Sequence, residues 1–258
     1  MLSDFPKIQC PFVRQTFKVN REQWSQSGNL FQLREPQVYL CVDKVNPGYE
    51  WVFDDPDTFC VEKLNGTNVK LRTEKGRLVE LQNRLNVLDP LQIVKGKTFI
   101  IEGIFRAVAK GYIPADGTFA GECIGPKLQG NPYHLDYHEW YPFDKAITDL
   151  RYKSFDQHAR TYDNWSTWFK DWLHSRYFIK RRGNLHGLNI PDNVFAEGVV
   201  FYNLKRKATG EQSYMAKLRR DMFPWFYEGI EIYDYVKEGR PVNAMEDDAA
   251  HARLQGVE

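Results

Sequence analysis

Residues 59–72 read FCVEKLNGTNVKLR. The segment begins and ends with short runs rich in β-branched and other apolar residues, which are typical of strands. A glycine-containing turn at residues 64–66 separates the two runs, and glycine permits the tight backbone bend that such a turn requires. The segment is therefore predicted to form two strands joined by a tight turn, with Lys63 at the end of the first strand.

Similar apolar segments recur along the rest of the chain, and turn residues separate them. Further strands are predicted at residues 38–42, 98–105, 138–143 and 197–203. The breaker residues between the predicted strands are Asn46-Pro47-Gly48, Lys75-Gly76, Ala115-Asp116-Gly117 and Thr209-Gly210. Short strands joined by turns favour an antiparallel α+β architecture over alternating βαβ units.

One segment has helical rather than strand periodicity. Residues 163–177 place large apolar side chains at spacings of three and four, which lie on one face of a helix. These side chains are Trp165, Trp168, Phe169, Trp172 and Leu173. The spacing predicts that they enter the hydrophobic core, and a stacking platform for nucleotides is the functional alternative.

Composition limits the class of protein. The chain has 258 residues, which permits one domain or two, and its 35 Lys and Arg residues nearly balance 34 Asp and Glu residues. Phosphate binding must therefore come from local basic patches, which occur at residues 180–182, 205–207 and 217–220. The four cysteines are widely spaced and no long apolar run occurs, so we expect a protein of a reducing, cytoplasmic compartment. No P-loop or dinucleotide-binding glycine motif is present.

Two segments in the first half of the chain carry candidate chemistry. Lys63 precedes the tight turn, where its amine can reach a ligand that approaches the backbone closely. Glu122 precedes the Gly125-Pro126 loop, and its carboxylate can accept both hydroxyls of a ribose. Taken singly, each residue is also compatible with an ordinary surface side chain beside a turn.

Two further segments follow in the second half. Glu197 lies at the start of an apolar strand, where its oxygens suit a hydrated Mg²⁺ ion. Lys217 and Arg219 are two positions apart, so they point to the same side if their segment is a strand. The sequence thus contains separate candidates for a nucleophile, a ribose contact, a metal ligand and phosphate contacts.

The order of these segments resembles a known superfamily. Lys63 in KLNG, Glu122 in ECIG, the strand WYPFD at residues 140–144, Glu197 in EGVV, and Lys217 in KLR look like motifs I, III, IIIa, IV and V. These are the motifs of the covalent nucleotidyltransferases, which comprise polynucleotide ligases and capping enzymes. The sequence EKLNGTN at residues 62–68 is most similar to the RNA ligase 2 type. The resemblance implies the nucleotidyltransferase (ligase adenylylation) fold, related in kind to ATP-grasp, with antiparallel sheets flanking a nucleotide pocket.

The resemblance also implies a reaction and its cofactors. Lys63 would attack the α-phosphorus of ATP to form lysyl-AMP and release pyrophosphate, after which the adenylate passes to a 5′-phosphate end. Lys217 and Arg219 would bind the α-phosphate, Glu122 the ribose, and Glu197 a Mg²⁺ or Mn²⁺ ion. Arg219 stands where lysine is usual in motif V, so its planar guanidinium would change the geometry of the phosphate contact.

The resemblance also implies an aromatic contact to the adenine base and a contact from an arginine of motif Ia. Phe143 would stack on the adenine. Tyr141 lies two positions earlier in the same predicted strand and would face the same side, so it is the alternative stacking ring. Arg84 resembles the motif Ia arginine that contacts the ribose or the polyphosphate. The remaining nucleotide-binding positions implied within motif I are Glu62, Asn65 and Gly66.

These expectations define a domain plan and a function. We expect an N-terminal extension at residues 1–54, a nucleotidyltransferase domain at 55–235, and a C-terminal tail at 236–258. The expected function is that of a monomeric, ATP-dependent RNA ligase without membrane contact, which joins 5′-phosphate and 3′-hydroxyl ends of RNA or of an RNA/DNA hybrid. A GTP-dependent capping-type guanylyltransferase and a catalytically inactive protein that binds nucleic-acid ends are the alternatives.

Overall fold

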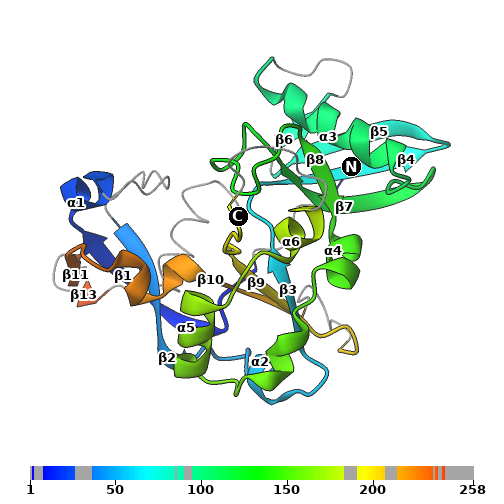
Figure 1. The fold of residues 1–258 in the computed structure, drawn as a ribbon. Helices are drawn as coiled ribbons and strands as arrows, with labels where there is room; N and C mark the ends of the chain where they lie inside the picture. The colour runs from blue at the N-terminus through cyan, green and yellow to red at the C-terminus, as the bar shows by residue number, and fades with distance from the viewer. Residues whose placement is uncertain are drawn as a thin grey trace. The chain divides into compact units, whose positions relative to one another are not determined.

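The computed structural model describes most of the chain (Figure 1). The described residues are 2, 8–26, 37–84, 86–89, 95–182, 191–206, 214–234, 236–237 and 240–241. The turn expected at Thr209-Gly210, Lys207 of the second basic patch and most of the expected C-terminal tail lie outside these residues. The protein has mixed α/β structure, and eight pairings between its strands are antiparallel, as the sequence predicted.

The chain divides into two compact units, which are described separately. The first unit contains residues 1–7, 61–153 and 174–196, and the second contains residues 8–60, 154–173 and 197–258. Residues 8–54 therefore belong to the same unit as the segment that carries Glu197, Lys217 and Arg219.

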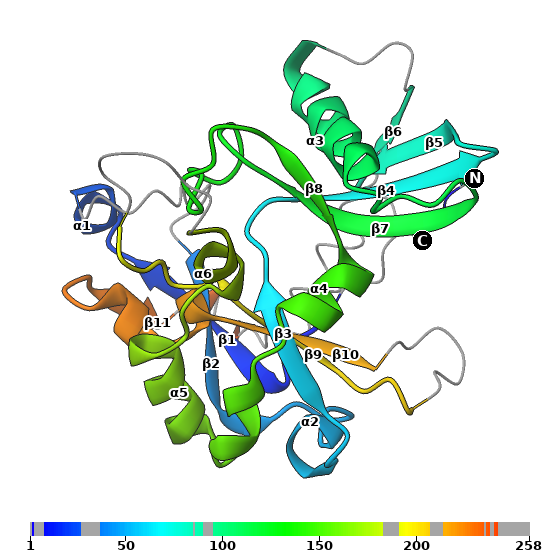
Figure 2. The ribbon, with the colours of Figure 1, turned by 45° about the vertical axis from the view of Figure 1, so that its right-hand side comes forward.

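The first unit is built on a five-stranded antiparallel sheet of order β6-β5-β4-β7-β8 (Figure 2). Its strands are β4 (Thr67–Glu74), β5 (Arg77–Asn83), β6 (Asn86–Leu88), β7 (Gly117–Ile124) and β8 (Glu139–Pro142). Its helices are α3 (Thr98–Ala109), α4 (Phe143–Asp149) and α6 (Arg176–Arg182), with a 3₁₀ turn at Lys95–Lys97. The core between α3 and one face of this sheet includes Val69, Leu71, Leu81, Cys123 and Trp140.

The strand predicted at residues 98–105 is wrong, because this segment forms helix α3. A run of β-branched and aromatic residues, TFII, suggested a strand. The buried residues Ile100, Ile104 and Ala107 instead recur at spacings of four and three, and they turn one helical face onto the sheet. Gly103 lies on the same face, where an added Cβ would be 2.9 Å from the backbone nitrogen of Trp140, so the helix approaches β8 closely.

The second unit contains two three-stranded sheets, of order β11-β1-β2 and β10-β9-β3, and the β12-β13 hairpin. The strands are β1 (Phe12–Val19), β2 (Gln37–Val45), β3 (Phe59–Lys63), β9 (Gly198–Tyr202), β10 (Met215–Arg219), β11 (Ile232–Asp234), β12 (Val236–Lys237) and β13 (Arg240–Pro241). The helices are α1 (Arg21–Gln26), α2 (Trp51–Asp54) and α5 (Tyr162–Asp171), with 3₁₀ turns at Arg220–Met222 and Pro224–Tyr227. A further 3₁₀ turn at Lys153–Gln157 and strand β3 each run across a boundary between the units.

The aromatic helix predicted at residues 163–177 is present only in part. Helix α5 begins after Thr161, whose side chain accepts a hydrogen bond from the backbone of Asn164, and it ends at Asp171. The predicted core residues Trp165, Trp168, Phe169 and Leu173 are buried, whereas Trp172 is 66% exposed. Trp172 stays outside the core because its backbone has already left the helical conformation at this C-cap position.

Candidate active site

Lys63 is the last residue of β3, and a turn at residues 64–66 connects it to β4. Gly66 lies directly against the end of β7, because an added Cβ would be 2.1 Å from the carbonyl oxygen of Cys123 and 2.8 Å from Cγ2 of Ile124. Only glycine fits this contact. The position of the turn after Lys63 is therefore fixed by the sheet rather than by the turn alone.

A second contact fixes the same turn from the loop between β7 and β8. The backbone N–H of Asn65 donates a 2.8 Å hydrogen bond to the hydroxyl oxygen of Tyr133, which is only 1% exposed. Gln129 of the same loop donates through Nε2 to the carbonyl oxygen of Gly66 at 3.5 Å. Sequence reasoning identified this loop but did not identify Tyr133. A buried tyrosine requires a partner for its hydroxyl, so the aromatic after Asn131-Pro132 was the available signal.

Glu62 precedes the candidate nucleophile, and its carboxylate points into the protein. Its two oxygens accept hydrogen bonds from the Ser175 hydroxyl at 2.6 Å and from the Tyr177 backbone N–H at 2.7 Å. Burial raises the pKa of Glu62 to about 7, although these hydrogen bonds act in the opposite direction. The carboxylate thus links the end of β3 to the segment that begins α6.

Replacing Glu62 with glutamine is expected to change how stability depends on pH. Because the pKa of Glu62 is raised above its ordinary value of 4.5, the wild-type free energy of unfolding should fall as pH rises from about 4.5 to about 7. The loss should be about 3 kcal/mol at 1.36 kcal/mol per pH unit. Glu62→Gln should lack this decline. Urea unfolding of both proteins at pH 5 and pH 8 tests it, and parallel pH profiles would contradict the expectation.

Glu122 lies on β7, and Phe143 directly follows the neighbouring strand β8. Glu122 of β7 is paired with Asn68 of β4 on one side and with Tyr141 of β8 on the other. Strand β8 ends at Pro142, and Phe143 is the first residue of α4, so the predicted alternation of Tyr141 and Phe143 along one strand is wrong. Tyr141 is buried and donates its hydroxyl to Asp149, whereas Phe143 is half-buried.

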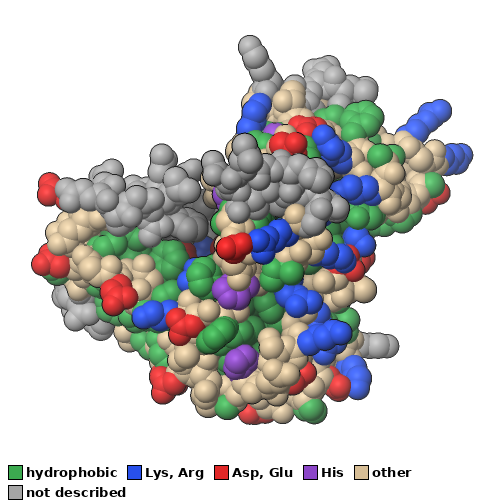
Figure 3. Space-filling view, in the orientation of Figure 1, with side chains coloured by type: hydrophobic (Ala, Val, Ile, Leu, Met, Phe, Trp, Pro, Cys, Tyr) green, Lys and Arg blue, Asp and Glu red, His purple; other side chains and the backbone are tan. Residues whose placement is uncertain are grey.

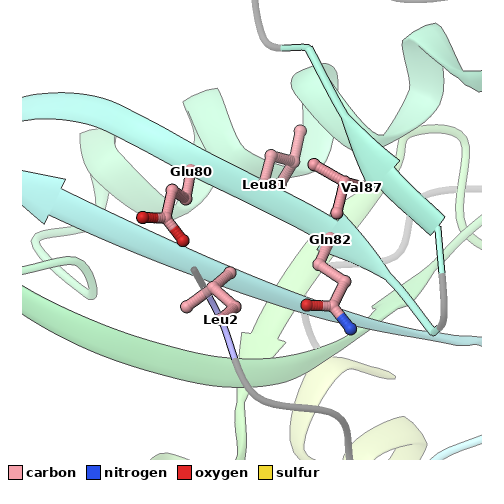
Figure 4. Close-up of a pocket in the computed structure, with 5 residues that line it drawn as sticks. All are labelled: Leu2, Glu80, Leu81, Gln82 and Val87. Carbon is pink, nitrogen blue, oxygen red and sulfur yellow. The ribbon is translucent and has the colours of Figure 1, made fainter.

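Arg84 follows β5 and adopts a left-handed backbone conformation, with φ at +52°, and its side chain is exposed. A pocket of about 300 Å³ lies beside the same strand and is lined by Leu2, Glu80, Leu81, Gln82 and Val87 (Figure 4). Figure 4 shows Glu80 and Gln82 directed toward Leu2, with Leu81 and Val87 on the other side. None of the residues predicted to bind a nucleotide lines this pocket.

Lys217 and Arg219 point to the same side of β10 in the second unit, as their spacing predicted. Both side chains are half-buried, whereas the intervening Leu218 is buried. Arg219 is paired with Gly198 of β9, where an added Cβ would be 2.1 Å from the carbonyl oxygen of Leu218. Glycine is therefore required directly after Glu197, so that β9 and β10 can approach at this position.

Arg219 lies among carboxylates of its own unit. Its guanidinium is 3.0 Å from Asp221 and 4.0 Å from Glu197. The backbone of Lys217 donates at 2.8 Å to the carbonyl oxygen of Gln9, which adds a parallel bridge from the N-terminal segment to β10. The sequence analysis did not select Asp221, although this acidic residue lies only two positions after Arg219.

The predicted site residues fall into two groups, one in each unit. The first unit contains Glu62, Lys63, Asn65, Gly66, Arg84, Glu122 and Phe143, and the second contains Glu197, Lys217 and Arg219.

Within the described ranges, no three His, Cys, Asp or Glu side chains cluster as metal ligands. His138 is already paired, with its Nδ1 atom 2.6 Å from the Glu102 carboxylate. No helix of the described residues is long and apolar enough to cross a membrane.

Comparison with known proteins yields no matching family model and no matching curated protein. Solved structures of Naegleria gruberi RNA ligase are similar in part. A variant with ATP and Mn has 15% identity over 62% of this chain and 49% of that chain, with a TM-score of 0.30. The same ligase with PPi has 16% identity over 67% and 51%, with a TM-score of 0.35. This chain thus spans about half the length of these ligases. Because the identities and TM-scores are low, the function is argued from the residues of this chain.

Proposed function

We propose that this chain is an ATP-dependent RNA ligase that uses Lys63 as its nucleophile. The observation that carries the proposal is the fixed turn after Lys63, which Gly66 and Tyr133 hold against the end of β7. Covalent catalysis requires a nucleophile at a defined position, and a side chain at a strand end beside such a turn meets this requirement. The ordered motifs that resemble those of nucleotidyltransferases support the same assignment.

The proposed reaction has three steps. The uncharged amine of Lys63 attacks the α-phosphorus of ATP and gives up a proton to solvent, so that an N–P bond forms, the bond to the leaving phosphate breaks, and pyrophosphate departs. A 5′-phosphate oxygen of the polynucleotide then displaces Lys63, whose nitrogen takes up a proton, and the N–P bond breaks as the adenylate is transferred. Finally, a 3′-hydroxyl attacks the activated phosphorus and gives up its proton to solvent, and AMP leaves as the phosphodiester forms. Lys217 and Arg219 are proposed to stabilise the negative charge on the α-phosphate oxygens.

The nucleoside is assigned to other residues of the chain. We assign the ribose hydroxyls to Glu122, the adenine face to Phe143, and a ribose or polyphosphate contact to Arg84. Asn65 and Gly66 are assigned to shaping the turn beside the nucleotide. Glu62 is assigned to holding the end of β3, because both its oxygens are bonded to the segment that begins α6.

The residues near Arg219 fit a magnesium or manganese ion. Such ions are commonly held by one or two carboxylates together with substrate phosphates, and Glu197 and Asp221 both approach the Arg219 guanidinium. When bound, the ion would withdraw charge from the phosphate oxygens during displacement. Arg219 would act on the same oxygens from the protein side.

Labelling of the wild-type protein decides between the candidate functions. Incubation with α-labelled ATP and Mg²⁺ or Mn²⁺ is expected to yield a covalent protein–nucleotide adduct, visible after denaturing electrophoresis. Stronger labelling by α-labelled GTP would select the capping-type guanylyltransferase instead. Binding of nicked duplex RNA without any adduct, under either metal, would select the inactive end-binding protein.

A further inference from the structure

Five cationic side chains of the first unit lie in a continuous cluster apart from the residues assigned above. They come from segments far apart in the sequence, and contacts through Tyr137, Tyr112 and Asp149 join four of them. We call these four the cation strip: Arg106, Lys110, Lys145 and Lys180. The fifth, Arg181, lies behind the strip with its side chain only 17% exposed. Figure 3 shows Lys and Arg side chains gathered over α4 and the adjoining end of β7.

Two tyrosines connect three of the four members of the strip. The Arg106 guanidinium lies 4.3 Å from the ring centre of Tyr137, and the Lys110 ammonium lies 5.9 Å from the same ring. Lys110 is also 5.8 Å from the ring centre of Tyr112, and Lys145 is 4.8 Å from that ring. Such contacts hold cations over aromatic faces without neutralising their charge.

Asp149 connects the other end of the strip. Lys145 and Lys180 both reach its Oδ2 atom, at 2.9 and 2.7 Å, and the Tyr141 hydroxyl donates to the same oxygen at 2.9 Å. Although burial acts in the opposite direction, these hydrogen bonds lower the pKa of Asp149 to about 2. The carboxylate is thus ionised at neutral pH and positions two ammonium groups side by side. Each ammonium has three N–H donors, of which Asp149 needs one.

A buried carboxylate lies beneath the middle of the strip. Glu139 is fully buried and binds Lys110 at 2.7 Å and Arg181 at 2.6 Å, and it also accepts from the Tyr177 hydroxyl. Its charge therefore positions two cations, as Asp149 does. Arg106 lies near a different carboxylate, that of Glu102, at 3.5 Å. The five cations of this cluster thus pair with three carboxylates, and Asp136 adds a fourth acidic group beside Tyr137, which leaves an excess of one positive charge.

The excess distinguishes this cluster from an ordinary ion-pair network, in which cations and carboxylates balance. In the second unit, for comparison, Lys205 pairs with Asp57 and Arg206 pairs with Asp55. The strip is also accessible, because its side chains are between 30% and 53% exposed. Because cations already lie over the rings of Tyr112 and Tyr137, a ligand that approaches the strip would contact these cations before it contacted the aromatic rings.

We propose that the cation strip binds the phosphate backbone of a polynucleotide, independently of its base sequence. A row of fixed cations matches a row of phosphates, whereas a single phosphate would meet only one or two of them. This inference rests on the proposed function, in which a polynucleotide is the acceptor of the adenylate. It identifies the surface by which the chain holds that acceptor.

The salt dependence of binding tests the strip. The affinity of a fluorescent RNA oligonucleotide would be measured from about 50 to 300 mM salt for the wild type and for Lys145→Ala/Lys180→Ala. The logarithmic salt slope is expected to become shallower by about 0.7–0.9 for each lysine lost, and the affinity at low salt to fall on the order of tenfold. Lys145→Arg/Lys180→Arg, which keeps both charges, should retain the wild-type slope.

Lys170→Ala is the matched control. Lys170 is also a lysine in the last turn of a helix, is 47% exposed against 53% for Lys180, and also lies near one carboxylate, that of Glu228. It lies outside the strip, so its replacement should leave the slope unchanged. An unchanged slope in Lys145→Ala/Lys180→Ala, or inorganic phosphate competing as well as an oligonucleotide of equal phosphate content, would overturn the proposal.

Self-labelling separates this inference from the proposed function. Adenylylation of the protein needs no polynucleotide, so Lys145→Ala/Lys180→Ala should be labelled by α-labelled ATP as strongly as the wild type while it binds RNA less tightly. Absence of labelling in the wild type would refute the ligase assignment and leave the salt slopes to decide the strip. Equal loss of labelling and RNA binding in the variant would refute the strip as a surface specific to the acceptor.

Discussion

Lys63→Ala is expected to lose the covalent adduct with AMP entirely and to reduce strand joining by a factor on the order of 10³ or more. Alanine supplies no nucleophile, and no N–P bond to residue 63 can form. The measurement is labelling with α-labelled ATP, followed by peptide mapping of the wild-type adduct to the segment that contains Lys63. Joining of a pre-adenylylated RNA end should survive better than joining that starts from ATP, because this substrate bypasses the first step.

Lys63→Arg is the control for charge at this position. Arginine keeps the positive charge but stays protonated and offers no amine to the α-phosphorus, so this variant should also fail to be labelled. Lys170→Ala, whose lysine is exposed on α5, should be labelled normally. Labelling of Lys63→Ala at the wild-type level would refute the assignment of the nucleophile.

Gly66→Ala is expected to have the second largest effect, although residue 66 supplies no reacting group. The added Cβ would lie 2.1 Å from the Cys123 carbonyl oxygen, so either the turn or the end of β7 must move. Overpacking of this kind costs about 1–3 kcal/mol of stability. A displacement of about 1 Å at the turn would reduce the rate of adduct formation about 100-fold.

Gly96→Ala is the matched control for the glycine substitution. Gly96 lies in the same unit, and an added Cβ there meets no atom within 4 Å. Its unfolding curve and its labelling rate should both stay near those of the wild type. A Gly66→Ala protein with wild-type stability and a wild-type labelling rate would show that the turn tolerates the displacement and does not position Lys63.

The strands of the fold could be predicted where their pattern is local. Strands β2, β3, β4, β8 and β9 lie where apolar segments and turn residues placed them. Helix α3 could not be recognised from its composition, because its TFII run has strand propensity while its burial follows a helical face. Packing of that face against the sheet prevailed over local propensity, as tertiary contacts often do.

The break between α5 and α6 depended on contacts that periodicity does not contain. Trp172 continues the three-and-four spacing of the aromatic residues, yet the chain leaves the helix there. Ser175, three residues later, is fully buried and binds Glu62, which precedes it by 113 positions. A helix continued through this segment would not retain the extended bridge that His174 forms with Phe195.

The sequence alone determined the chemical candidates: Lys63 before a turn, Glu122 and Glu197 at strand segments, and the paired cations Lys217 and Arg219. Periodicity and turn chemistry act over a few residues, so they can be read without coordinates. Tertiary structure decided which partners hold these residues. Tyr133 meets Asn65 across 68 positions, and Lys145 and Lys180 reach Asp149 from the separate helices α4 and α6. Such contacts form because buried polar groups must find partners wherever folding brings them, which no local pattern records.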